Sequence, residues 1–355
     1  MTISTWSQSA NSNYNDPGNW SATVPGSGDT AEFEASGKTN ISIVSAFIGA
    51  GEWLFNPGAG QYNFEISLFS DLLFDGAGIT INAGSAHLLN FGVVGFFSGS
   101  TAGGALIDNF GFIEVFNSST LGVATIHTFG GGGRLVFFPN GTGGSAQLVT
   151  DAGGIADFSG SAGHDGLGHM TVGSIAGAGT YKLGHDQLMV GLNGLSSEVS
   201  GPIEDGGDAE NAGSGGSLVK VGPGTLKLSY PGNTYSGGTI LEGGAFDVAS
   251  IGAAGTGGIA FAGKATLEIE KASFSGHVFG NPIYFFGKHD VLDLTGLHFH
   301  AGATATYHKA AHHLTIHSAS ITDTLTILSP HSPHGTHFEA ASDHHGGTEV
   351  FLIIA

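Results

Sequence analysis

A short alternating segment recurs along the chain at a nearly constant spacing, and each copy follows a glycine-rich turn. In residues 218–248, LVKVGPGTLKLSYPGNTYSGGTILEGGAFDV, apolar residues alternate with polar residues between closely spaced glycines. Alternation with a period of two is typical of a strand that buries one face. The alternating apolar residues return after 20 and then 21 residues, in the pairs Leu226 and Leu228, Phe246 and Val248, and Leu267 and Ile269.

A spacing near 20 residues predicts an all-β solenoid in which each repeat forms one turn. Strands of successive turns would stack in parallel about 4.8 Å apart, so that equivalent residues form ladders. A second series, Phe97, Phe116, Phe138 and Phe158, has spacings of 19, 22 and 20 residues. We expect the phenylalanines to form interior ladders, with one residue exposed in pairs such as Phe96 and Phe97. The alternative, an antiparallel sandwich, predicts turns about every 8 to 12 residues and no such register.

The composition fits a folded chain and excludes two classes of partner. Glycine accounts for 63 of the 355 residues, but a hydrophobic content of 40% is too high for a disordered chain. Acidic residues outnumber basic ones 29 to 9, Arg134 is the only arginine, and the formal charge is −20. Nucleic acids and anionic membranes require clustered basic residues, so neither is expected as a partner. No apolar run is long enough for a transmembrane helix.

Residues 218–248 resemble the passenger-associated transport repeat, also called the autotransporter-associated β-strand repeat, of bacterial secreted proteins. The matching positions are Leu218, Lys220, Gly222, Gly224, Thr225, Leu226, Leu228, Ser229, Asn233, Thr234, Tyr235, Gly237, Gly238 and Thr239. The chain departs from the repeat at Tyr230, Pro231 and Gly232, where the family has a shorter segment. The resemblance implies a right-handed parallel β-helix that is exported by secretion machinery and is extracellular or attached to the bacterial surface.

The pattern divides the chain into four expected regions. Residues 1–60 are expected to form N-terminal capping rungs, 61–200 β-helix rungs, 201–270 the β-helix with the transport repeat, and 271–355 a histidine-rich C-terminal β module. About 85 residues follow Ile269, fewer than an autotransporter's translocator domain requires, so we expect either a passenger without its translocator or a separate export route. The ending EVFLIIA, an acidic residue followed by an apolar run, is similar to the C-terminal signal of type I secretion substrates. Alternatively, Val350 to Ile354 form a last buried strand.

Thirteen of the 18 histidines lie between His277 and His345. Alternation in TGLHFHAG and HHLTIHS places several imidazoles on one outward face if the two segments pair as a hairpin. If these imidazoles share one face, they could together bind Zn²⁺, Ni²⁺ or Cu²⁺. The candidate ligands are His298, His300, His308, His313 and His317. The alternative is that they are solvent-facing polar residues, because no carboxylate stands at a companion ligand spacing.

The sequence contains no motif of a known catalytic centre. Asp151 and Asp157 could meet on neighbouring rungs with Asp165 and its nearby histidines, and isolated surface charges are the alternative. We therefore expect a non-catalytic structural or adhesion protein with no bound cofactor. A surface polysaccharide or a host matrix is its expected partner. The alternatives are a polysaccharide lyase or hydrolase on the same scaffold, which needs paired carboxylates on adjacent rungs, and a histidine-based metal binder.

Overall fold

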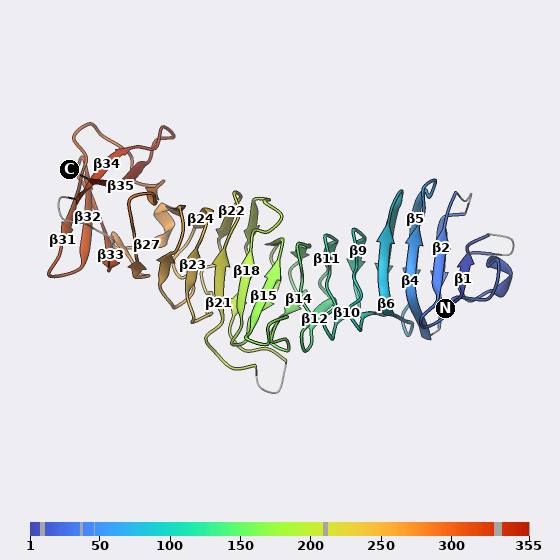
Figure 1. Ribbon diagram of the computed structural model, residues 1–355. Coiled ribbons are helices and arrows are strands. Elements are labelled where there is room, and N and C mark those ends of the chain that lie inside the picture. The colour runs from blue at the N-terminus through green and yellow to red at the C-terminus, as the bar shows by residue number, and fades with distance from the viewer. Residues whose placement is uncertain (8–10, 36–37, 46, 209–211, 330–335, 355) are drawn as a thin grey trace. The chain divides into compact units, whose positions relative to one another are not determined.

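The chain folds almost entirely into short strands and turns (Figure 1). The structure, a computed structural model, describes residues 1–7, 11–35, 38–45, 47–208, 212–329 and 336–354. Within these ranges there is no α-helix, only the 3-10 turns η1 (Pro17–Asn19) and η2 (Lys271–Ser273), and hence no helix that could span a membrane. Two compact units are formed: unit 1 comprises Met1–Lys182 and Gly207–Ala212, and unit 2 comprises Leu183–Gly206 and Gly213–Ala355.

The strands build a β-solenoid of about 12 turns with about 22 residues in each turn. This confirms the predicted all-β parallel β-helix, with turns slightly longer than the expected 20 residues. The register is continuous within each unit: in unit 1, for example, Phe112 pairs with Arg134, and Arg134 pairs with Ile155 in the turn after that. The handedness of the coil stays a prediction.

Unit 1 contains two parallel sheets, each of which receives one strand from each turn. The first consists of β1 (Ile3–Thr5), β2 (Thr30–Phe33), β4 (Phe47–Phe55), β6 (Asp71–Ile81), β8 (Val93–Phe96), β10 (Phe112–Val115), β12 (Arg134–Phe137), β14 (Ile155–Asp157) and β17 (Thr180–Lys182). The second consists of β3 (Asn40–Ile43), β5 (Gln61–Ile66), β7 (Ser85–Asn90), β9 (Leu106–Asn109), β11 (Thr125–Thr128), β13 (Gln147–Thr150) and β16 (Ser174–Ala176). Strand β15 (His169–Val172) also belongs to unit 1.

Phenylalanine ladders run along both the inside and the outside of unit 1. Phe137 and Phe158 are fully buried and stack with their ring centroids 4.8 Å apart. Phe97, Phe116 and Phe138 instead stack on the partly exposed outer face, at 4.7 and 4.0 Å. The predicted series of four phenylalanines therefore divides between two faces. The cause is the register, because Val136 pairs with Asp157 and this places Phe158 opposite Phe137 rather than Phe138.

Aromatic side chains cover the first turn of unit 1. The Trp6 and Trp20 rings meet edge to face at 5.2 Å, and Trp20 contacts Phe33 of β2 at 6.0 Å. Nε1 of Trp20 donates a hydrogen bond to the carbonyl of Tyr14. Because the end of a solenoid leaves apolar side chains and a strand edge without a next turn, these residues give the terminal turn a packed surface.

Unit 2 continues the same construction with different strands. One sheet contains β18 (Gln187–Val190), β21 (Ser217–Lys220), β23 (Thr239–Leu241), β25 (Ile259–Phe261), β29 (Ile283–Tyr284) and β33 (Ile321–Leu328). The other contains β19 (Ser197–Val199), β22 (Thr225–Leu228), β24 (Gly244–Val248), β26 (Ala265–Ile269), β30 (Val291–Leu294), β35 (Thr348–Ile354) and β34 (Thr336–Ser342). The predicted interior ladder is present, since Leu226, Phe246 and Leu267 are paired in register and buried.

In the sheet that contains β30, the parallel pattern ends at that strand. Strand β35 pairs with β30 in the antiparallel direction, with Leu292 opposite Val350, and β34 pairs with the other edge of β35. Val350 and Leu352 are buried, so the apolar run near the C-terminus forms a core strand of the folded chain. Whether the same residues also act as an export signal stays a prediction. The remaining strands of the unit are β20 (Ile203–Glu204), β27 (Phe274–Ser275), β28 (Val278–Phe279), β31 (Thr304–His308) and β32 (His313–Ser318).

Candidate functional site

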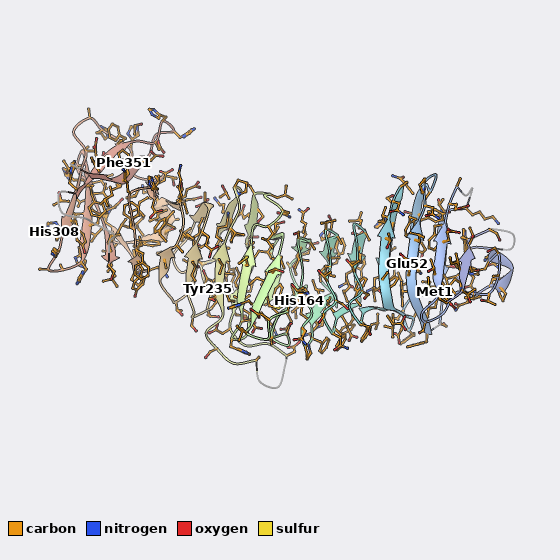
Figure 2. The ribbon with its side chains drawn as sticks, in the orientation of Figure 1. Met1, Glu52, His164, Tyr235, His308 and Phe351 are labelled. Atoms are coloured by element: carbon orange, nitrogen blue, oxygen red, sulfur yellow. The ribbon has the colours of Figure 1, made fainter. Side chains whose placement is uncertain are left out.

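The five histidines predicted as metal ligands lie on and beside one antiparallel hairpin. Strand β31 pairs with β32, which places His308 directly opposite His313 and Thr304 opposite His317. Leu314 and Ile316 are buried between the outward histidines of β32, as the alternation predicts. His308 lies at the edge of the hairpin (Figure 2). His298 and His300 precede β31.

The imidazoles of His308 and His317 contact different hydroxyl groups and do not converge on one point where a metal ion could bind. Nε2 of His308 lies 3.2 Å from the Thr315 hydroxyl, and Nδ1 of His317 lies 2.9 Å from the Thr322 hydroxyl. The rings of His298 and His300 face each other at 4.9 Å. In the described part of the chain, no three His, Asp or Glu side chains are arranged as a metal site. Binding of Zn²⁺ or Ni²⁺ by the five histidines stays a prediction.

The carboxylates suggested as a catalytic group do not form a single cluster. Asp151 follows β13 in the second sheet of unit 1, where it contacts His127, whereas Asp157 lies in β14 of the first sheet. Asp165 forms a separate pair with His169 at 2.5 Å. The one-dimensional spacing of these residues does not reveal which sheet each strand joins.

The residues that match the transport repeat hold successive turns together. Lys220 is buried and its ammonium group donates to the carbonyls of Val221 and Gly222 and, one turn later, of Gly243, at 2.7 to 3.1 Å. Burial lowers the pKa of Lys220 to about 8. Gly244 follows with a φ of 67°, and a Cβ atom there would lie 2.4 Å from the Gly222 carbonyl oxygen. This corner of the turn therefore requires glycine.

The other polar residues of the repeat act in the same way. The side chain of Asn233 accepts from the Ile203 amide and donates to the Ala253 carbonyl, both at 2.7 Å, so it bridges the turns on either side. The buried Tyr235 hydroxyl (Figure 2) lies 2.8 Å from the hydroxyl of Thr239. Because buried polar groups are stable only when they are paired, these contacts fix the register of the stack. The repeat is thus an architectural element, and its matched residues do not form an open site.

A row of acidic side chains runs along the outward face of unit 2. Asp247 of β24 pairs with Glu268 of β26, Glu268 with Asp293 of β30, and Asp293 with Glu349 of β35. We call these four residues the carboxylate ladder. Lys227 of β22 precedes them in the same row and lies 3.2 Å from the Asp247 carboxylate.

The carboxylate ladder is partly withdrawn from water. Asp247 is 7% exposed, and one carboxylate oxygen each of Asp247 and Asp293 has no hydrogen-bond partner among the described residues. Burial, followed by the neighbouring Asp343 and Glu349 carboxylates, raises the pKa of Asp293 to about 7. Burial also raises the pKa of Asp247 and of Glu268. Stacked carboxylates in a partly dry environment favour protonation or binding of a cation.

The sequence carries a signal for the first three charged positions of this row. The polar residues Lys227, Asp247 and Glu268 each stand between the two inward apolar residues of a repeat, so the period that aligned the core also aligned them. The acidic residue of VLDL, Asp293, continues the series 25 residues later. The pairing with Glu349 carried no such signal, because it arises from the antiparallel strand β35.

A different row lies on the outward face of the second sheet of unit 1. The His87 and Asp108 side chains are 2.8 Å apart, His127 lies 4.0 Å from Asp108, and the other ring nitrogen of His127 lies 3.2 Å from Asp151. We call these four residues the alternating ladder. Imidazole and carboxylate groups take turns along it, so each carboxylate has an imidazole as neighbour.

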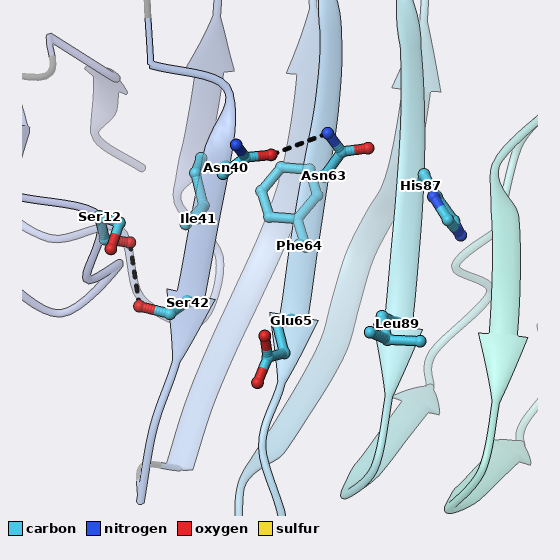
Figure 3. A pocket seen from close by; sticks show the side chains of 9 residues that line it. All are labelled: Ser12, Asn40, Ile41, Ser42, Asn63, Phe64, Glu65, His87 and Leu89. Carbon is cyan, nitrogen blue, oxygen red and sulfur yellow. Dashed lines mark hydrogen bonds between the residues drawn. The ribbon is translucent and has the colours of Figure 1, made fainter.

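An open hollow of about 380 Å³ lies next to the alternating ladder, over β3, β5 and β7 (Figure 3). Its polar groups are largely bonded to one another: the amide of Asn63 donates to the Asn40 side chain at 2.9 Å, and the Ser42 hydroxyl donates to the Ser12 carbonyl. His87 lies on the opposite side of the hollow from Ser12, and Glu65 lies between them (Figure 3). The hollow offers amide, hydroxyl and carboxylate groups at a shallow surface, a composition suited to polar surface contacts.

Comparison with known families identifies one segment of the chain. The family model described as passenger-associated-transport-repeat matches residues 218–248. Comparison with the curated proteins and with the solved structures gave no match. The repeat found in this comparison is the segment whose residues hold β21 to β24 together, and it lies within a β-solenoid.

Proposed function

We propose that this chain, a β-solenoid with a passenger-associated transport repeat, is a secreted or cell-surface protein with a structural or adhesive, non-catalytic role. The observation that carries the proposal is the repeat itself, which forms consecutive turns of the solenoid instead of an appended module. Passengers of this kind are exported by secretion machinery, so the extracellular location follows from the same observation. We propose a surface polysaccharide or a host matrix as the adhesion partner.

The composition supports this proposal. The formal charge of −20 and the single arginine disfavour nucleic acid and anionic membranes as partners. The outward faces of the turns carry in-register rows of polar side chains beside rows of stacked phenylalanines, and such rows suit many weak contacts with an extended partner. The stability of the fold comes from contacts between neighbouring turns. Outward side chains can therefore vary without loss of the fold, and a structural or adhesive role does not require one localised site.

The experiment that tests the proposal measures location first and attachment second. Cells that express the full chain are separated into medium, surface and cytoplasm, with protease treatment of intact cells to detect surface exposure. Recovery in the medium or protease sensitivity supports the proposal, and retention in the cytoplasm overturns it. A matched pair of strains with and without the chain is then compared for attachment to surfaces coated with polysaccharide or matrix protein. Equal attachment overturns the adhesive role.

The role of the C-terminus in export requires point substitutions. Removal of the residues after Thr348 would delete most of β35 and leave β30 without its partner strand, so a retained truncated chain would be ambiguous. Phe351, which is half-buried and faces away from the paired core positions, can be replaced by serine at lower structural cost. Loss of export with an unchanged melting temperature would support a signal in this segment.

A second candidate function, polysaccharide hydrolysis, has one observation in its favour. Glu268 and Asp293 occupy adjacent turns on the same face, and their pKa values are raised. The stacking distance of about 4.8 Å between turns is close to the roughly 5 Å that separates the two carboxyl groups of retaining glycosidases. Release of reducing ends from polysaccharides by the wild-type chain, and its loss in Glu268→Gln and Asp293→Asn, would support this function. No release from a broad panel would exclude it.

A further inference from the structure

A second hollow, of about 320 Å³, lies on the outward face of the first sheet of unit 1, over β10, β12 and β14. Its floor is apolar and consists of Phe112, Val136 and Phe138. These side chains point away from the core, and Phe112 is 44% exposed. A large aromatic side chain that is left in water costs free energy. The packing of the core does not explain Phe112, because its side chain lies on the outward face. An apolar floor with a few convergent polar groups is typical of a small-molecule site.

Arg134, the only arginine of the chain, lies in the wall of this hollow. One of its terminal nitrogens is bonded to the Asp208 carboxylate, and Lys182 lies 3.0 Å from the other oxygen of that carboxylate. The Arg134 Nε–H is buried and has no hydrogen-bond partner among the described residues. A buried donor without a partner has lost its hydrogen bonds to water and gained none in return, which destabilises the folded chain. A ligand acceptor at this point would remove that cost.

Glu114 stands across the floor from Arg134, in the next strand of the same sheet. It is half-buried, and this burial, followed by the charge of Asp71, raises its pKa. A carboxyl group in this state serves as a hydrogen-bond acceptor when ionised and also as a donor when protonated.

The remaining acidic group of the hollow, Asp157, is already occupied. One of its oxygens accepts from the amide and hydroxyl of Ser159 at 3.0 and 2.6 Å, and the other accepts from the Asp208 amide at 2.8 Å. Asp157 is 1% exposed and both of its oxygens are bonded within the protein, so it forms part of the wall and is not available to a ligand. The parts of the lining without a hydrogen-bond partner among the described residues are thus the apolar floor, Arg134 Nε and Glu114.

The charges of the hollow select the ligand. Three carboxylates, Glu114, Asp157 and Asp208, surround two cations, Arg134 and Lys182, so the region carries one net negative charge at neutral pH. An anionic ligand would meet this charge as well as the −20 of the chain. A purely apolar ligand would bury Arg134 Nε and Glu114 without partners. A ligand with one apolar face and several hydroxyl groups satisfies both the floor and the wall.

We propose that this hollow binds a neutral sugar residue, with the apolar face of the pyranose ring on Phe112 and Phe138 and its hydroxyl groups bonded to Arg134 Nε and Glu114. This inference rests on the proposed adhesive function, because it specifies which polysaccharide component the exposed solenoid contacts. It narrows the partner from surface polysaccharide in general to neutral glycans.

The test uses the purified full chain and saturation-transfer NMR with neutral oligosaccharides, namely glucan, mannan and galactan fragments, and with oligogalacturonate as the anionic comparison. We expect binding of at least one neutral fragment and none of oligogalacturonate. Phe112→Ser and Arg134→Lys should each weaken that binding at least tenfold, because the first removes the floor and the second removes the Nε donor while keeping the charge. Phe47→Ser, which changes another exposed phenylalanine of unit 1, is the matched control and should leave binding unchanged.

Absence of binding to every neutral fragment, preference for oligogalacturonate, or unchanged binding in Phe112→Ser would each overturn the proposal. Because Arg134→Lys also alters the contact with Asp208, its melting temperature is measured beside that of Phe112→Ser, which leaves this contact intact. Failure of the proposed function has a different signature. If the chain is exported and promotes attachment equally well with Phe112→Ser, the adhesive role stands and the sugar site is wrong. If the site binds sugar but the chain remains in the cytoplasm, the adhesive role fails alone.

Discussion

The alternating ladder of unit 1 and the carboxylate ladder of unit 2 are built by the same geometry and have opposite electrostatics. In both, parallel strands place outward side chains of successive turns next to each other. In unit 1 the neighbours are His87, Asp108 and His127, and each charge has a group of complementary character beside it. In unit 2 the neighbours are Asp247, Glu268 and Asp293, three carboxylates in succession, and Lys227 contacts the first of them. Parallel stacking therefore places the charges of equivalent positions next to one another in successive turns, so that their attraction or repulsion is repeated along the row.

The largest expected effect comes from removing Lys227, the cation that precedes the carboxylate ladder in the same row. Lys227 contacts the buried Asp247 and also Glu270, so Lys227→Met leaves two carboxylates uncompensated. We expect a loss of about 3 kcal/mol in the free energy of unfolding at pH 7.5. The loss should shrink at pH 4, because burial raises the pKa of Asp247 and so favours its protonated, uncharged form as the pH falls. Urea unfolding at the two pH values measures this, and the exposed Lys264→Met is the control; equal losses at both pH values would contradict the explanation.

Conversion of the carboxylate ladder into an alternating one should have the opposite sign. Glu268→Lys places a cation between Asp247 and Asp293, one turn from each. We expect a gain of about 1 to 2 kcal/mol at pH 7.5, because repulsion is replaced by attraction in a partly dry environment. Thermal unfolding of the variant beside Glu268→Gln separates the added charge from the removed one. A lysine variant no more stable than the glutamine variant would show that the ladder does not act as a unit.

A smaller effect is expected from neutralising one rung. The pKa of Asp293 is about 7 in the folded chain, above its ordinary value near 4, so the folded state holds this proton more tightly. The resulting stability is present below pH 4 and is lost as the pH rises through 7. Asp293→Asn should therefore stabilise the chain by about 1 kcal/mol at pH 8, a modest value because the group is half exposed, and by almost nothing at pH 4. Unfolding of both chains at a series of pH values measures this difference. A stabilisation that stays constant across the series would contradict this account.

The smallest effect should come from the alternating ladder. Asp108→Asn removes the central carboxylate between His87 and His127, and all three side chains are partly exposed. We expect a loss of about 0.5 kcal/mol at pH 6 that disappears in 1 M salt. Glu65→Gln, on the same sheet, controls for the change in net charge. A loss that persists in salt would indicate a packing role for Asp108.

The sequence predicts the repetitive part of this molecule well and its exceptions poorly. Alternation and period identify the parallel turns and the interior ladder of Leu226, Phe246 and Leu267, because both depend on contacts between equivalent positions. The pairing of Asp293 with Glu349 depends on the antiparallel strand β35, and the repeat spacing of the sequence does not predict it. The hairpin of His308 and His313 is visible in the alternation, whereas the distances between imidazoles depend on rotamers that alternation does not contain.

The antiparallel junction of β35 with β30 has a consequence for how chains of this kind meet one another. A parallel stack whose last edge stays open is a template on which the first turn of another copy can grow, and repeated addition gives fibres. Strand β34, on the far side of β35, carries the exposed side chains His337 and Glu339. Charged side chains on an edge strand oppose its extension. This edge therefore disfavours the addition of another strand, and variants from which β34 and β35 are deleted should form filaments in proportion to their concentration.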